Sequence, residues 1–246
     1  MDWLQRLPSE SVMRLASTGL PRQVLRHLIF EHDAGVGSRV LDVGCGSGEL
    51  VRYLHQLGFR VAGLDESPEM IAAARHADPH LDFHCERVEK QVSVGKPSFD
   101  LVLVRNLEPY TGNLLSVNAL WATANLLKCV RPGGHLVFVD CHETAAPEGA
   151  AGHAAACYAR HLSVFPGPCR TALFRDGIIR RMSWNWIPRR SPYSGIITAS
   201  IQCPENPFTR VDWLSLADAA STTHSTPCCQ WARISSEQQA KRRTAA

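Results

Sequence analysis

The sequence predicts a doubly wound α/β fold, in which helices cover both faces of a mostly parallel sheet. Three observations favour this fold class. Short apolar strands alternate with amphipathic helices from residue 39 to residue 140. A glycine-rich turn directly follows the first strand. The run "FDLVLVRN", from Phe99, is apolar on both faces, as expected of a central parallel strand covered by helices. Right-handed crossovers between such strands produce this architecture.

Composition and charge narrow the class of protein. The chain has 246 residues, 45% of them hydrophobic, which fits one main domain with a sizeable core. The formal net charge of +3 gives no strong field for a polyanion. We find no apolar run near the roughly 20 residues of a membrane span, and no apolar stretch typical of a secretory signal. Nine cysteines without a CxxC pair suggest buried thiols. We therefore expect a soluble, cytoplasmic protein.

Each element of the first half follows from its own pattern. Ser9 or Ser11 would cap a helix that Gly19 ends, and Pro21 would begin a second helix. The next elements are, in order, a strand at Arg39–Val43, a helix at Glu49–Leu57, a strand at Phe59–Leu64 that ends in Asp65, a helix from Pro68 with Met70, Ile71 and Ala74 on its buried face, and a strand at Leu81–Cys85.

The second half begins with the strand from Phe99. A long helix at Leu114–Val130 is expected to turn Leu120, Trp121, Ala124, Leu126 and Leu127 toward the sheet. "RPGG", residues Arg131 to Gly134, ends that helix, and "HLVFVD" forms a fifth strand. Beyond Asp140, we expect a helix within Pro147–Leu162 and late strands or a hairpin within Cys169–Ile187 and Tyr193–Cys203.

The stretch "LDVGCGSG", residues Leu41 to Gly48, places three glycines in five positions. In an open parallel sheet, ligands bind at the carboxyl ends of the strands, where this turn lies. Glycines permit positive φ and let a ligand lie against bare backbone amides. The GxGxG spacing differs from the GxGxxG of dinucleotide-binding turns. An acid at Asp42, two residues before the first glycine, suits a cationic amino group better than a pyrophosphate.

These motifs resemble those of the class I S-adenosylmethionine-dependent methyltransferases, which have a Rossmann-like doubly wound fold. The similarity covers Arg39 to Asp140, with "LDVGCGSG", "FDLV" and "RPGG" in the expected order. The resemblance implies that S-adenosyl-L-methionine is the cofactor and that Asp42 helps to hold its methionine ammonium, often through water. The turn beneath the cofactor would consist of Gly44, Cys45, Gly46 and Gly48.

The resemblance also implies cofactor contacts at the ends of the next three strands. Asp65 would accept hydrogen bonds from both ribose hydroxyls. Met70 would pack beside the adenine, and Glu86 would accept its exocyclic amine. The other residues that we assign to the cofactor are Glu66, Arg87, Arg105 and Asn106, the last two where the family's backbone reaches the cofactor's amino acid end.

The pattern divides the chain into four parts. We expect a helical cap at 1–36, a cofactor-binding core at 37–145, a segment at 146–215 that completes the fold and covers the acceptor, and a flexible tail at 216–246.

The acceptor of the methyl group should lie over the ends of the fourth and fifth strands. Candidates for contact or proton removal there are Glu108, Tyr110, Asp140, His142 and Glu143. His142 is our candidate base, because an unperturbed imidazole titrates near neutral pH. No fixed catalytic triad is required, since a base is needed only when the nucleophile arrives protonated. A small molecule is the favoured acceptor.

Several alternatives remain open. A nicotinamide-dependent oxidoreductase is one alternative, which the GxGxG spacing disfavours. A cofactor-binding protein without turnover is another hypothesis. Nucleic acid is a disfavoured partner, although basic and aromatic residues are interleaved at Arg180, Arg181, Trp184, Trp186, Arg189 and Arg190. His153, Cys157 and His161 share one face of a helix, near Cys169, but a partly buried helix face explains them better than zinc does, and we predict no metal.

Overall fold

In the described part of the chain, eight strands form one sheet in the order β3-β2-β1-β4-β5-β8-β6-β7. The computed structural model describes residues 20, 22–94, 98–105, 107–142, 155–175, 178–181, 195–205 and 212–223. The strands are β1 (Arg39–Val43), β2 (Arg60–Asp65), β3 (Asp82–Cys85), β4 (Phe99–Arg105), β5 (Val130–His142), β6 (Cys169–Arg175), β7 (Ile178–Arg181) and β8 (Gly195–Gln202). Strands β1 to β5 run parallel, β8 is antiparallel to both β5 and β6, and β7 closes a hairpin with β6.

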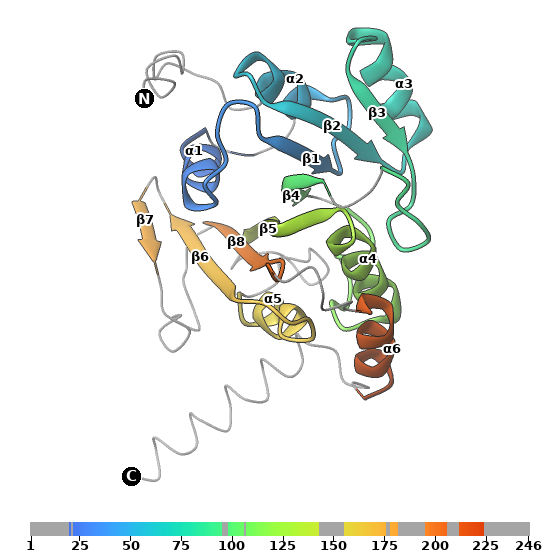
Figure 1. Cartoon of the computed structure of the whole chain (residues 1–246), viewed down its shortest axis with the longest axis vertical. Coiled ribbons are helices and arrows are strands. Elements are labelled where there is room, and N and C mark those ends of the chain that lie inside the picture. Colours follow the sequence, from blue (N-terminus) through green and yellow to red (C-terminus); the bar gives the residue numbers. More distant parts are fainter. Residues whose placement is uncertain are drawn as a thin grey trace.

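Helices cover both faces of this sheet, which confirms the predicted doubly wound architecture (Figure 1). Helices α1, α2 and α3 lie on one side of the sheet, and α4, α5 and α6 lie on the other. Their bounds are α1 (Arg22–Glu31), α2 (Glu49–Gln56), α3 (Pro68–Ala77), α4 (Val117–Leu127), α5 (Ala155–Leu162) and α6 (Trp213–Thr223). The predicted helix at residues 9–19 lies outside the described residues.

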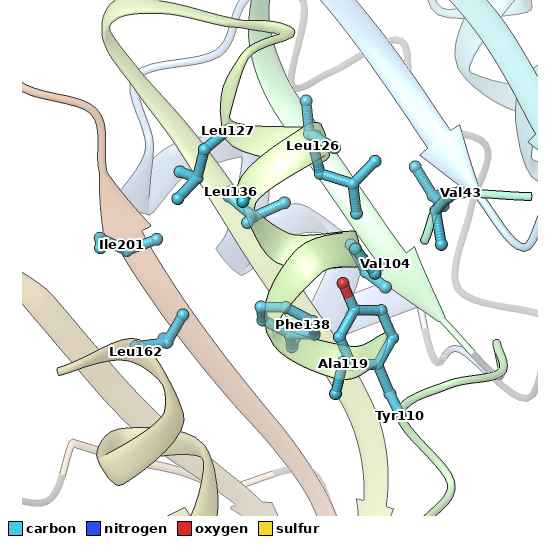
Figure 2. Close-up of a cluster of buried hydrophobic side chains, with 14 of the residues drawn as sticks. Val43, Val104, Tyr110, Ala119, Leu126, Leu127, Leu136, Phe138, Leu162 and Ile201 are labelled. Carbon is cyan, nitrogen blue, oxygen red and sulfur yellow. The ribbon is translucent and has the colours of Figure 1, made fainter. Parts of the chain in front are cut away.

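Alternation along the strands divides the core between the two faces. In β5, Leu136 and Phe138 belong to the cluster beneath α4, whereas Val137 and Val139 belong to the cluster beneath α1 and α2. Figure 2 shows α4 lying across β4 and β5, with Phe138 beside Tyr110. Both strands are therefore buried on both faces, as the apolar run from Phe99 predicts.

Two predicted core side chains lie at the surface instead. Met70 is 48% exposed, because Ile71 and Ala74 form the buried face of α3 and Met70 stands beside it. Trp121 is 39% exposed, and its indole Nε1 donates a hydrogen bond of 2.6 Å to Asp218 on α6. The indole therefore joins α4 to α6 at their solvent edge and does not face the sheet.

The predicted tail begins too early, because residues 216–223 belong to α6. Trp213 and Ala217 are buried one helical turn apart, and partly buried Leu214, Leu216 and Ala220 pack against the same cluster. These apolar residues alternate with polar ones, so the average composition of the segment is polar although one face of α6 is apolar and packs on α4. The prediction of a tail relied on that average. "RPGG" likewise lies within β5, where the pairing with β4 shifts register, and does not form a separate break.

A buried chain of hydrogen bonds links the loop after β4 to α4 and α5. The Nδ1 of His161 donates to the Leu114 carbonyl at 2.6 Å, which leaves Nε2 to accept from Thr123 Oγ1 at 2.7 Å. The Tyr110 hydroxyl in turn donates to Thr123 Oγ1 at 3.0 Å. Burial is the main cause that raises the pKa of Tyr110, so its hydroxyl stays protonated as a donor.

We predict that Thr123→Val lowers the free energy of unfolding by about 2–4 kcal/mol, because the nearly isosteric side chain leaves buried polar atoms of Tyr110 and His161 without this partner. Urea denaturation measures the change. Tyr53→Phe is the matched control, since the Tyr53 hydroxyl has no hydrogen-bond partner among the described residues. Equal stability of Thr123→Val and the parent protein would contradict this prediction.

Candidate functional site

The glycine turn after β1 is held against the end of β2. The amide of Gly44 donates to the Leu64 carbonyl at 2.8 Å, and the amide of Gly46 donates to the Asp65 carboxylate at 2.8 Å. Gly44, Gly46 and Gly48 all have positive φ, of 79°, 53° and 82°. The backbone of this turn therefore follows a path that side chains disfavour.

The three glycines differ in what surrounds them. A Cβ on Gly44 would lie 2.0 Å from the carbonyl oxygen of Arg105, and one on Gly48 would lie 2.7 Å from the ring of Phe83. A Cβ on Gly46 would meet nothing within 4 Å. Gly44 and Gly48 thus allow close packing within the protein, whereas Gly46 borders open space. That open cradle of bare backbone fits the predicted cofactor.

Asp65 faces the turn. Its Oδ2 accepts from the Gly46 amide, and its Oδ1 accepts from the Ser67 amide at 2.9 Å. Ser67 caps α3 by accepting from the Met70 amide, so Asp65 is fixed between the turn and the start of that helix. The half-buried Asp65 carboxylate therefore lies beside the open cradle, and its contact with ribose stays a prediction.

The structure also brings three other predicted residues to this edge. The amide of Glu86 donates to the Asp65 carbonyl at 3.1 Å, while the Glu86 carboxylate accepts from the amide and hydroxyl of Ser93. Arg87 lies 3.8 Å from the Glu66 carboxylate, closer to Glu89 at 2.6 Å. Glu66, Glu86 and Arg87 therefore remain candidate contacts, but the Glu86 carboxylate already has a partner in Ser93.

Asp42 and Arg105 form a buried ion pair between β1 and β4. The guanidinium Nη2 lies 3.0 and 2.8 Å from the two carboxylate oxygens, and Nε lies 3.1 Å from Oδ1. The side chains are 0% and 3% exposed. The positive charge of Arg105, on the neighbouring strand, thus balances the charge of the Asp42 carboxylate. The sequence analysis did not predict this pair. A contact of Asp42 with a ligand ammonium stays a prediction that this pairing does not support.

A pocket of about 180 Å³ opens at the carboxyl ends of β4 and β5, where the acceptor was expected. It is lined by Val104, Leu107, Tyr110, Thr111, Phe138, Val139, Asp140 and Tyr158. The ring centroid of Phe138 lies 4.9 Å from that of Tyr110 and 5.5 Å from that of Tyr158. Leu107 also lies 3.7 Å from the Cβ position of Gly44, so the pocket and the glycine turn share a wall.

The carboxylate of Asp140 is paired in this pocket with a residue that the sequence reading missed. Tyr158, from α5, donates its hydroxyl to Asp140 Oδ2 at 2.9 Å. Burial and then the charge of Asp140 raise the pKa of Tyr158, so the tyrosine acts as a donor. Asp140 lies on β5 and Tyr158 lies on α5, 18 positions further along the chain. No sequence motif predicts such a contact.

Other predicted residues are placed only in part. The backbone of His142 pairs with Gly195 in the sheet, but its side chain lies outside the described residues. Glu108 is exposed and accepts from the Thr111 hydroxyl, while Tyr110 is turned toward Thr123. Also outside the described residues are Asn106, Glu143, His153, Trp184, Trp186, Arg189, Arg190 and the side chains of Arg180 and Arg181.

The helix face with His153, Cys157 and His161, for which we predict no metal, makes other contacts where it is described. Both ring nitrogens of His161 are hydrogen-bonded, to Thr123 and Leu114, and Cys157 packs in the core. Among the described residues, no group of three or more His, Cys, Asp or Glu side chains is arranged to hold a metal ion. None of the helices described has the length and apolarity to cross a bilayer.

A larger pocket, of about 450 Å³, lies at the opposite ends of the strands, where β5 begins and β8 ends. Its lining includes His32 and His135, whose ring centroids are 4.5 Å apart. Ligands of doubly wound folds bind at the carboxyl ends of the strands, so this position argues against the larger pocket as the reaction site.

Residues 41–138 match the family model of the methyltransferase domain. The chain is 33% identical over 114 residues to the ubiquinone biosynthesis O-methyltransferase of Xanthomonas campestris pv. campestris, a match that covers 45% of this chain and 46% of that protein. It is 32% identical over 122 residues to the protein of the same name from Photobacterium profundum, covering 48% and 50%. The chain thus spans about half the length of the curated relatives it matches.

Among solved structures, the chain resembles N-methyltransferase NodS from Bradyrhizobium japonicum in complex with S-adenosyl-L-homocysteine. The TM-score is 0.55, with 19% identity over 83% of this chain and 97% of that one. This likeness supports the fold. The family model matches a methyltransferase domain at residues 41–138, and this agrees with the ordered motifs that resemble those of the class I S-adenosylmethionine-dependent methyltransferases. The comparisons give no support to the nicotinamide-dependent alternative.

We predict that Arg105→Met lowers the free energy of unfolding by about 3–5 kcal/mol, because it leaves the buried carboxylate of Asp42 without its cation. The double variant Asp42→Leu/Arg105→Met should recover much of that loss, since it removes both charges. Urea denaturation of the parent, of Arg105→Met, of Asp42→Leu and of the double variant completes a double-mutant cycle. Additive losses from the two single changes would show that the pair is not coupled.

The two histidines of the larger pocket should make the stability of the protein sensitive to acid. Burial, and then repulsion from His135, lowers the pKa of His32 to about 3, and burial also lowers the pKa of His135. The unfolded chain binds these protons near pH 6.5, so this stability is complete above about pH 6.5 and is lost as the pH falls toward 3. Urea midpoints measured on both sides of pH 6.5 should fall on the acid side, and less in His32→Phe. Parallel declines in variant and parent would argue against a role of His32.

Proposed function

We propose that this protein transfers a methyl group from S-adenosyl-L-methionine to a small-molecule acceptor. The observation that carries the proposal is the shared wall between an open glycine cradle and an aromatic pocket, formed where the chain after β4 passes Gly44. A methyl donor in the cradle and an acceptor in the pocket would thus be neighbours, which is the condition for an in-line transfer.

The residues around the cradle would hold the cofactor in distinct ways. The Asp65 carboxylate would receive the ribose hydroxyls while it keeps its bonds to Gly46 and Ser67, since each carboxylate oxygen accepts more than one hydrogen bond. Gly44, Cys45, Gly46 and Gly48 would form the floor, and Met70, which is exposed on α3, would pack beside the adenine. Bound there, S-adenosyl-L-methionine supplies a methyl group activated by the positive charge of its sulfonium.

The pocket would align the acceptor and exclude water. Its apolar walls come from β4, the loop after it, β5 and α5, and except for Val139 they belong to one core cluster. The relatives are named for O-methylation in ubiquinone biosynthesis, and this supports a small hydroxylated acceptor here. In our proposal, the segment at 146–215 completes this site, because α5 contributes Tyr158. The cap at 1–36 contributes α1, which packs against the opposite face of the sheet.

A cytoplasmic location fits the thiol chemistry of the protein. The six cysteines within the described residues are free, at positions 45, 85, 129, 157, 169 and 203. Burial raises the pKa of Cys45, Cys129 and Cys203, which keeps these thiols protonated and unreactive. A reducing compartment suits such a set.

We expect isothermal titration calorimetry to detect S-adenosyl-L-methionine binding, weakened at least about tenfold by Asp65→Ala, because the ribose would lose a charged acceptor. Asp82→Ala, an exposed change on β3, is the matched control and should bind as the parent does. Asp65→Asn removes the charge but keeps one acceptor oxygen. Its affinity therefore separates the effect of the lost charge from the effect of a distorted glycine turn.

The same titration distinguishes the alternatives. Binding of NAD(H) in preference to S-adenosyl-L-methionine would support the oxidoreductase and overturn the proposal. Cofactor binding without methylated product, assayed with a labelled methyl donor in cell extract, would identify a binding protein that lacks turnover.

A further inference from the structure

The lining of the acceptor pocket has one feature that its apolar walls do not explain. Among the described lining residues, Asp140 alone carries a charge. Thr111 is exposed, and its hydroxyl is directed to the Glu108 carboxylate, so it marks the mouth. The carboxylate lies at the end of β5, next to Val139 and close to the ring of Tyr158.

Tyr158 fixes the orientation of this carboxylate. The tyrosine is 3% exposed and donates to Oδ2 at 2.9 Å, while its ring packs against Phe138. Phe138 is in turn held by Tyr110, whose hydroxyl belongs to the chain through Thr123 and His161. A rigid frame of three rings therefore presents one negatively charged acceptor group to a pocket with apolar walls.

The size and the walls of the pocket limit its ligand. A volume of about 180 Å³ is below the roughly 300–1,000 Å³ of pockets for drug-sized molecules, so it suits a single ring. Faces and edges of aromatic rings favour a planar aromatic partner. A polar group of such a ligand is costly to bury without a hydrogen bond, and Asp140 offers an acceptor.

The chemistry of Asp140 favours a hydroxyl on that ring. A hydroxyl donates its proton to a carboxylate and keeps lone pairs on oxygen for attack, whereas a protonated amine has no lone pair. A cationic amine would also be repelled by a neighbouring sulfonium.

We propose, resting on the proposed function, that Asp140 binds the hydroxyl of a monocyclic phenolic acceptor and takes its proton, and that Tyr158 is the positioning residue for this carboxylate. The acceptor O–H bond breaks, and its proton moves to a carboxylate oxygen of Asp140. The acceptor oxygen bonds to the transferred methyl carbon, and the electron pair of the broken C–S bond stays on sulfur. The proton then leaves Asp140 to water.

The test uses 4-nitrophenol without cofactor, because its absorbance separates phenol from phenolate. The parent protein should bind the protonated form. Asp140→Asn should weaken that binding about tenfold to a hundredfold and lower the apparent pKa of the bound probe, because the negative charge that disfavours phenolate is gone. Tyr158→Phe, which keeps the ring, should cause a smaller loss in the same direction.

Controls separate this effect from a loss of folding. Tyr53→Phe and Asp33→Asn repeat the same chemical changes away from the pocket and should bind the probe as the parent does. 4-Nitroanisole, which has no hydroxyl proton, should bind equally to the parent and to Asp140→Asn. Thermal unfolding, monitored by circular dichroism, checks that each variant is folded.

Three outcomes would overturn the inference. The first is equal binding of 4-nitrophenol by the parent and a folded Asp140→Asn, and the second is no binding by the parent. The third is tighter, Asp140-dependent binding of 4-nitroaniline, which would assign the pocket to an amine. Each of these leaves the Asp65 titration unaffected, so failure here is distinguishable from failure of the proposed function.

Discussion

The ion pair between Asp42 and Arg105 joins β1 and β4 at the point where both strands end, and both parts of the site are built on those ends. The glycine turn continues from β1, and the pocket wall continues from β4 through Leu107. The Arg105 carbonyl approaches so closely that residue 44 has no room for a Cβ. The pair is buried and charged, so its two partners are useful to stability only together.

This arrangement gives the two carboxylates near the cradle different roles. Asp42 is buried and satisfied by Arg105, which makes it part of the framework. Asp65 is half-buried, is held by two backbone amides, and borders the open side of Gly46. Burial and partners, rather than residue type, therefore separate the structural acid from the acid that we propose to bind the cofactor.

The pocket shows how a helix outside the glycine-turn core completes a site. The aromatic frame spans the loop after β4, strand β5 and helix α5, and hydrogen bonds through Thr123 and His161 fasten it to α4. Because Tyr158 and Asp140 come from separate elements, the pocket depends on tertiary packing more than the glycine turn does.

The sequence by itself determined the order of elements, the fold class and the position of the glycine turn, because these rest on local patterns of apolar residues and glycines. It also predicted that the acceptor binds at the ends of β4 and β5, where the structure has a pocket. Only the tertiary structure decided which partners the side chains meet: Arg105 for Asp42, Ser93 for Glu86, and Tyr158 for Asp140. It also placed Met70 and Trp121 at the surface and residues 216–223 in a helix on α4. Such contacts join residues far apart in the chain, and no local pattern of residues encodes the distance between them.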